Sequence, residues 1–152
     1  MKTSVADTRC AIDGVAALHD HIVTKARAAR ASFADPTSSD WMGRFLSDRT
    51  IVRYPLGVRY DAQPLRCGEF ACLESLGETP SDGFVLFVHP MLEGRMAQLP
   101  LVVAYFVPSV NYGAVASREE AELFGATLFA MPQDAYYAGL RAIADEVRCR
   151  TS

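Results

Sequence analysis

The segment from Phe84 to Val107 constrains the fold of this chain more than any other. It contains two apolar runs, residues 84–89 and 101–107, which are separated by a more polar connection. Both faces of each run are apolar, which is typical of strands that are covered on both sides. Pro100 and Pro108 flank the second run, where the ends of a strand tolerate a residue without an N–H. We therefore predict two central strands that form an antiparallel hairpin with a longer loop.

Three weaker patterns predict further strands upstream of this pair. Residues 51–54 form one candidate strand that ends at Pro55, and residues 57–61 alternate between apolar and polar side chains. Residues 69–76 alternate less cleanly, and the turn-forming segment 77–83 follows them. Together these runs predict an antiparallel sheet of about four to five strands, because strands that follow one another directly usually pair.

The N-terminal segment has the periodicity of one long helix. Between residues 5 and 33, apolar side chains recur at the spacing of one helical face. The acidic residues come early and the basic residues late, which suits the helix dipole. A break rich in Pro, Ser and Asp follows at residues 35–40. Asp40 is then placed to cap a short helical turn from Trp41 to Leu46.

Two further helices are expected in the last third of the chain. Ser117 and Glu120 have the spacing of a capping box, so a helix should run from there to about residue 130. Residues 123–131 carry no charge, and a helix that is apolar all round needs burial on all sides. Pro132 suits the first turn of a second helix that ends near residue 148.

The order of these elements indicates the fold class. One helix, several consecutive strands and two helices make an α+β fold rather than an alternating α/β fold. We predict a single domain over residues 1–152, in which a long N-terminal helix and a C-terminal helical pair pack on the antiparallel sheet.

Charge and composition narrow the classes of partner. The net charge is −3 and few of the basic residues are clustered, whereas nucleic-acid binding proteins usually carry an excess of basic residues on one face. We therefore do not expect nucleic-acid binding. No apolar run is long enough to cross a membrane, and the N-terminus lacks the apolar core of a secretory signal. We therefore expect a cytoplasmic protein whose four cysteines are reduced. The excess of Arg over Lys is associated with bacterial genomes of high GC content.

His89 is the residue that most invites a functional interpretation. It ends a predicted central strand, and loops that follow such strands often carry functional groups on a rigid scaffold. A neutral imidazole there acts as a base or a ligand, or it simply caps the sheet and forms a hydrogen bond with a loop carbonyl. The residues we expect around it as a ligand-binding set are Glu93, Glu69, Tyr105 and Arg59.

Other polar residues have simpler interpretations. His19 and His21 resemble a metal pair, but two positions on a helix rotate the side chains about 200° apart. A packed His19 with one hydrogen bond is therefore the preferred reading. Cys67 and Cys72 match no zinc or redox spacing, so at least one of them should be a small core residue. No motif predicts a cofactor or a bound metal.

Two function hypotheses remain, and a catalytic residue cannot be named for either. The first is a non-enzymatic binding or accessory module that forms a homo-oligomer through residues 123–137, with a protein or small-molecule partner. The alternative is a small-molecule or metal-dependent enzyme whose site surrounds His89.

Overall fold

The computed structural model describes residues 5–33, 35–36 and 38–151 of the chain. Its longer elements are α1 (Val5–Phe33), α2 (Trp41–Ser47), β1 (Leu56–Tyr60), β2 (Ala71–Ser75), β3 (Phe84–Val88), α3 (Leu99–Tyr112), α4 (Arg118–Leu128) and α5 (Gln133–Thr151). Short 3-10 turns lie at η1 (Pro80–Asp82), η2 (Pro90–Leu92) and η3 (Gly113–Val115). The α+β class is therefore as predicted.

The sheet differs from the prediction in size and in direction. The described residues form a three-stranded mixed sheet in the order β1-β3-β2, not an antiparallel sheet of four to five strands. Strand β1 runs parallel to β3, with Val58 beside Leu86, whereas β2 runs antiparallel to β3, with Leu73 beside Leu86. The segment 57–61 was thus correctly expected to be extended, but its neighbour in the sheet is not its neighbour in sequence.

The apolar run 101–107 forms a helix, so the predicted hairpin does not exist. Helix α3 covers the run from Leu99 to Tyr112, and Pro100 occupies its first turn, where the missing N–H has no consequence. Buried apolar runs satisfy helix and strand templates equally well, so periodicity alone does not separate them. Here the run is long enough for a core helix, and burial on nearly all sides outweighs the strand preference of its valines.

The predicted strand at residues 51–54 is also absent. The N–H groups of Ile51 and Val52 both donate to the carbonyl of Asp48, at 3.0 and 2.8 Å, so the chain turns there instead of extending. Both side chains are buried in the core. The apolar side chains of Ile51 and Val52 therefore indicate a buried turn, and in so short a segment a buried turn has the same pattern as a strand.

The helical predictions at the two ends are confirmed. Helix α1 spans the predicted residues, and the side chain and N–H of Ser117 form a capping box with Glu120 at the start of α4. Helix α5 begins at Gln133, directly after Pro132. Asp40 does precede α2, but its side chain makes no capping hydrogen bond and instead pairs with Arg44 at 3.2 Å.

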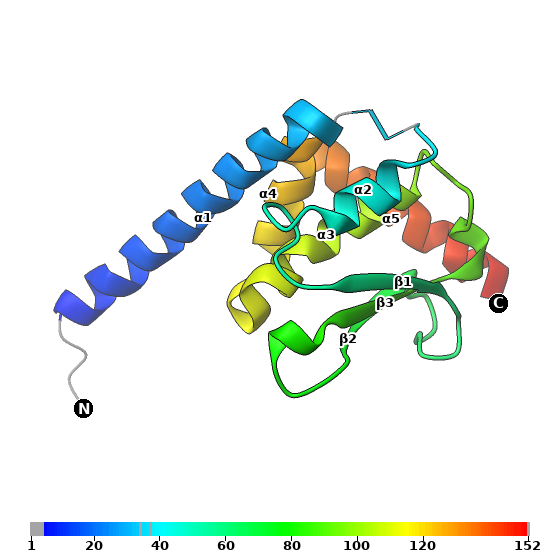
Figure 1. Cartoon of the computed structure of the whole chain (residues 1–152), viewed down its shortest axis with the longest axis horizontal. Coiled ribbons are helices and arrows are strands. Elements are labelled where there is room, and N and C mark those ends of the chain that lie inside the picture. The colour runs from blue at the N-terminus through cyan, green and yellow to red at the C-terminus, as the bar shows by residue number, and fades with distance from the viewer. Residues whose placement is uncertain (1–4, 34, 37, 152) are drawn as a thin grey trace.

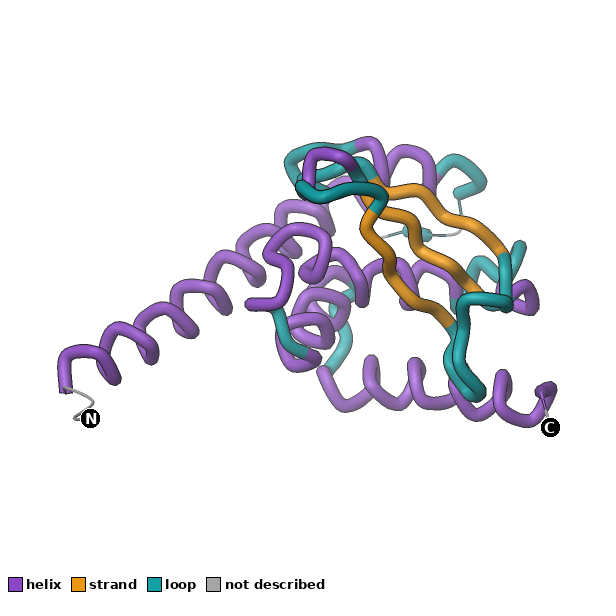
Figure 2. Tube along the Cα trace, turned by 90° about the horizontal axis from the view of Figure 1, so that it is seen from below, coloured by secondary structure: helices purple, strands orange, loops and turns teal. Residues whose placement is uncertain are grey.

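One face of the sheet packs on the helices. Leu86 and Val88 of β3 belong to the same buried core as Val102 and Val107 of α3. Helix α4 packs against α1, α3 and α5, and Figure 1 shows the first turns of α1 extending away from the rest of the molecule. In Figure 2 the sheet turns its other face to the viewer, and no α-helix lies over that face. None of the described helices has the length and apolarity needed to cross a lipid bilayer.

Candidate binding site

Strand β2 lies at an edge of the sheet, and its hydrogen bonds show which main-chain groups face the open side. The His89 N–H donates to the Phe70 carbonyl at 2.8 Å, and the Leu76 N–H donates to the Gly83 carbonyl at 3.0 Å. In an antiparallel pair the residues that exchange hydrogen bonds alternate along the strand. Residues 70, 72, 74 and 76 therefore direct their main-chain groups toward β3.

The intervening residues of β2 direct their main-chain groups away from the sheet. These residues are Ala71, Leu73 and Ser75, and within the described part of the chain their N–H and C=O groups have no hydrogen-bond partner on that side. An edge of this kind is a template for another strand, and proteins usually protect it with charge, proline or a covering element. Here the edge residues carry no proline.

A groove of about 670 Å³ runs along this open edge. We call it the edge groove. Its wall on one side is β2 with the residues before it, and its wall on the other side is α3 and η3. The lining residues are Gly68, Glu69, Phe70, Ala71, Cys72, Leu73, Tyr105, Phe106, Ser109, Gly113, Ala114 and Ala116. Glu69 is the one charged residue among them, so the groove presents mainly apolar and main-chain surface.

Tyr105 stands at the end of the edge groove, on the face of α3 that also carries Ser109. Its ring packs edge-on against Phe106, with 5.3 Å between the ring centroids. Burial raises the pKa of the Tyr105 hydroxyl, and the nearby Glu122 carboxylate raises it further, while Arg118 opposes the shift. The hydroxyl therefore stays protonated and available as a hydrogen-bond donor at neutral pH.

A second hollow, of about 390 Å³, adjoins the first one. We call it the arginine hollow. Phe70 and Tyr105 line both spaces, so the two hollows adjoin at these side chains. The remaining lining residues come from α4 and α5 and are Arg118, Glu122, Tyr137, Leu140, Arg141, Ala144, Asp145 and Arg148. The hollow thus combines apolar and aromatic walls with three guanidinium groups.

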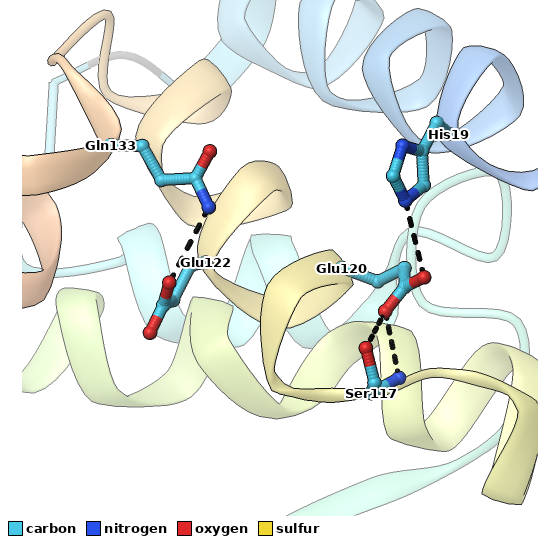
Figure 3. A network of polar contacts seen from close by, with 5 residues as sticks. All are labelled: His19, Ser117, Glu120, Glu122 and Gln133. Atoms are coloured by element: carbon cyan, nitrogen blue, oxygen red, sulfur yellow. Dashed lines mark hydrogen bonds and ion pairs between the residues drawn. The ribbon is translucent and has the colours of Figure 1, made fainter. Parts of the chain in front are cut away.

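The acidic residues of the arginine hollow are already paired. Glu122 lies 3.6 Å from the Arg118 guanidinium and accepts a hydrogen bond from the Gln133 amide at 3.4 Å, which Figure 3 shows on the left. Asp145 lies 4.0 Å from Arg148. Three arginines against two carboxylates leave one positive charge in excess among the described lining residues, and Arg141 forms no ion pair within that set.

The structure brings together two of the five residues expected in a site around His89. Glu69 and Tyr105 meet at the edge groove. Arg59 lies apart from them, in a hollow on the outer face of the sheet. Glu93 lies close enough to Tyr60 to raise the pKa of its hydroxyl, after the larger effect of burial.

His89 itself lines neither hollow and caps η2. The N–H of Met91 donates to its Nδ1 atom at 3.2 Å, so in the neutral ring the proton resides on Nε2. The ring thus binds the loop that follows the strand, as the structural interpretation expects, but its partner is a loop N–H and not the expected loop carbonyl. No group of three or more His, Cys, Asp and Glu side chains within the described residues has the geometry of a metal site.

The other polar residues that the sequence singled out have structural partners. His19 donates to Glu120 at 3.2 Å, as the preferred interpretation requires, and Figure 3 shows that this contact joins α1 to the start of α4. His21 instead packs edge-on against Tyr112. Cys67 is exposed and Cys72 is only half-buried, so neither is the small core residue that was expected. The Cys72 thiol lies 3.9 Å from the Pro64 carbonyl, and burial together with Glu69 raises the pKa of that thiol.

Sequence reasoning missed most of the residues that build these two hollows. Phe70 precedes a short strand, and Arg118 and Arg141 lie on the polar sides of ordinary amphipathic helices. A solvent-facing arginine is the common case, so none of these positions carries a local signal of function. Glu69 and Tyr105 were named for a different site, and the signal that would have joined them is the strand order, which follows from the tertiary fold.

Comparison with known proteins assigns no relative to this chain. No family model matches the sequence, no curated protein matches it, and no solved structure matches the fold.

Proposed function

We propose that this protein is a non-enzymatic binding module that takes up an extended peptide as an additional strand beside β2. The proposal starts from the geometry alone, since no relative supplies a function. The observation that carries it is the row of outward main-chain groups on Ala71, Leu73 and Ser75, of which Ala71 and Leu73 line the edge groove. Strand addition to an exposed sheet edge is a recurring mode of peptide recognition.

The hydrogen-bonding capacity of the edge sets the expected affinity. Three residues with an N–H and a C=O each offer up to six main-chain hydrogen bonds to a partner strand. Each contributes about 0.5–1.5 kcal/mol net, and ordering the peptide opposes this gain. We therefore expect micromolar rather than nanomolar binding from the main chain alone, with side-chain contacts adding specificity.

The walls of the groove indicate which peptide side chains fit. Alternate side chains of an added strand point to opposite faces, so every second one faces α3. There they meet Tyr105, Phe106 and Ser109, a mostly apolar surface with little charge. An extended peptide with β-branched apolar residues at alternate positions fits this surface best, because such residues favour strands and pack on a pleated surface.

The test uses a set of N-acetylated hexapeptides in which Val or Ile alternates with Thr, Ser or Lys, each made as a free acid and as an amide. Binding is followed on isotope-labelled full-length protein by the amide signals of Ala71, Leu73 and Ser75. The expected result is a saturable shift of these signals by some members of the set. If no peptide moves them at millimolar concentration, the proposal is wrong.

A substitution pair isolates the main-chain contribution. Ser75→Pro removes an N–H that points away from the sheet, and edge strands tolerate proline at such a position. Ser75→Ala keeps the N–H and removes the same exposed hydroxyl. We expect Ser75→Pro to weaken peptide binding by about three- to tenfold relative to Ser75→Ala, the value of one main-chain hydrogen bond. Equal affinities for the two variants would contradict strand addition at this edge.

A second copy of the chain is the competing occupant. The expected interface at residues 123–137 loses its main support, because Phe124, Leu128 and Tyr136 are buried within the monomer. Tyr137 remains exposed there, and the β2 edge is the alternative place for self-association. Sedimentation at increasing concentration distinguishes the cases. A dimer whose formation shifts the Leu73 amide would replace the peptide proposal.

The cytoplasmic location stays part of this proposal. Its support is that Cys67 and Cys72 both carry free thiols, one of them exposed, and free thiols persist in a reducing compartment.

A further inference from the structure

We propose that the arginine hollow receives the C-terminal carboxylate of the peptide that lies along β2. This inference rests on the proposed function, and it adds the direction of the peptide and the nature of its end. The protein then binds peptides at their free C-termini rather than at internal segments.

The two hollows adjoin, and this supports the assignment. Phe70 directly precedes β2, and both it and Tyr105 line the edge groove as well as the arginine hollow. A Cβ placed on Gly68 would lie 3.7 Å from the Nε atom of Arg148, which shows how closely the segment before β2 approaches α5. A strand in the groove that continues past Ala71 is therefore directed past Phe70 toward the arginine hollow.

Charge fixes the direction of the peptide. An added strand antiparallel to β2 ends with its carboxyl terminus beside Ala71, whereas a parallel strand would bring its amino terminus there. The guanidinium groups of Arg118, Arg141 and Arg148 favour the carboxylate and repel an ammonium group. Because Glu122 and Asp145 already pair with two of these arginines, Arg141 is the residue left to bind an incoming anion.

The hollow also provides a neutral donor and apolar walls. The Tyr105 hydroxyl stays protonated and lines the space, so it donates to an anion there. Leu140 and Ala144 form apolar wall beside it, which suits the last side chain of the peptide. The C-terminus of a peptide that ends in an apolar residue presents these two groups together, a carboxylate and an apolar side chain.

The experiment compares the free acid and the amide of the tightest-binding hexapeptide, measured by isothermal titration on the full-length protein. On the unmodified protein we expect the free acid to bind about tenfold more tightly, the value of one charge-assisted hydrogen bond. In Arg141→Gln this ratio should fall to about one, while the amide binds as before. Arg27→Gln, which removes an exposed arginine from α1, is the matched control and should keep the full ratio.

Each outcome separates this inference from the function on which it rests. If both peptide forms bind the unmodified protein equally, the carboxylate site is refuted and strand addition stands. If neither form binds, the proposed function fails first. If the ratio persists in Arg141→Gln, the carboxylate is held elsewhere and the assignment to the arginine hollow is wrong. Trp41 is buried in the core, so unchanged tryptophan fluorescence verifies that the Arg141→Gln variant is folded.

Discussion

The side chain of Asn111 is expected to be a main support of the fold. It lies in the last turns of α3 with 5% of its surface exposed. Its Oδ1 atom accepts a hydrogen bond from the Arg53 N–H at 2.7 Å, and its Nδ2 atom donates to the Ile51 carbonyl at 2.7 Å. This amide therefore ties α3 to the irregular segment that leads into β1.

Truncation to Asn111→Ala removes both hydrogen bonds at once. The Ile51 carbonyl belongs to a residue that is 4% exposed, so it loses its partner without gaining water, which costs about 1–3 kcal/mol. The Arg53 residue is exposed, so its N–H regains water and contributes about 1 kcal/mol or less. We expect a loss of about 1–4 kcal/mol in the free energy of unfolding, and a fall in Tm of roughly 2–16 °C for a chain of this size.

Urea unfolding followed by tryptophan fluorescence measures this loss. Trp41 is the single tryptophan, and its buried ring stacks on Phe45 with 4.6 Å between centroids, so its emission reports the native core. Gln98→Ala is the matched control, because this amide precedes the same helix and makes no capping hydrogen bond. Its cost should stay near 0.5 kcal/mol. Equal losses for the two variants would refute the reasoning that Asn111 acts through its buried hydrogen bonds.

Two further substitutions test the packing and the acid response of the helical layer. Gly125→Ala places a methyl group against the ring of Tyr136, so it should destabilise the protein by about 1–3 kcal/mol or more. Gly139→Ala is the control, because its methyl group meets only ordinary contact, and it should stabilise the helix by about 0.5–1 kcal/mol. If Gly125→Ala leaves the free energy of unfolding in urea unchanged, the packing of Gly125 against Tyr136 is contradicted. Burial raises the pKa of Glu120, but hydrogen bonds led by the one from Ser117 outweigh this and hold the pKa below its ordinary value of 4.5. The stability that Glu120 contributes is therefore present above about pH 4.5 and is lost as the pH falls through the lowered pKa of the folded state. Glu120→Gln should then flatten the decline of the free energy of unfolding in acid. If the variant shows the same pH dependence of stability as the unmodified protein, this carboxylate is not involved.

The sequence predicted the elements whose signals are local. The capping box at Ser117, the periodicity of residues 5–33 and the polar loop before Phe84 all act within a few residues, and each matches the structure. The single hydrogen bond of His19 was also expected from its position on the apolar face of its helix. These features depend on chain geometry that no distant residue alters.

The sequence did not predict whether a buried apolar run forms a strand, a helix or a turn. Residues 101–107 satisfy a buried strand and a buried helix equally, and the choice depends on which neighbours cover the run. In the fold, α4 packs against α3 and β3 covers it from the sheet side, so the run is enclosed as a helix. The short run at Ile51 became a turn for the same reason, since burial rather than strand pairing explains its apolar side chains.

The binding site belongs almost wholly to the tertiary structure. The sequence supplied the residue types, among them Glu69 and Tyr105, but it placed them around His89. Their actual meeting depends on the strand order β1-β3-β2, which leaves β2 at an edge beside α3. Local propensity carries no information about strand order, because that order follows from which buried faces fit together once the helices have formed. The sequence by itself therefore determined the N-terminal helix, the C-terminal helical pair and the central strand of this protein. Only the packing of those elements decided that residues 99–112 form a helix and that one sheet edge stays open.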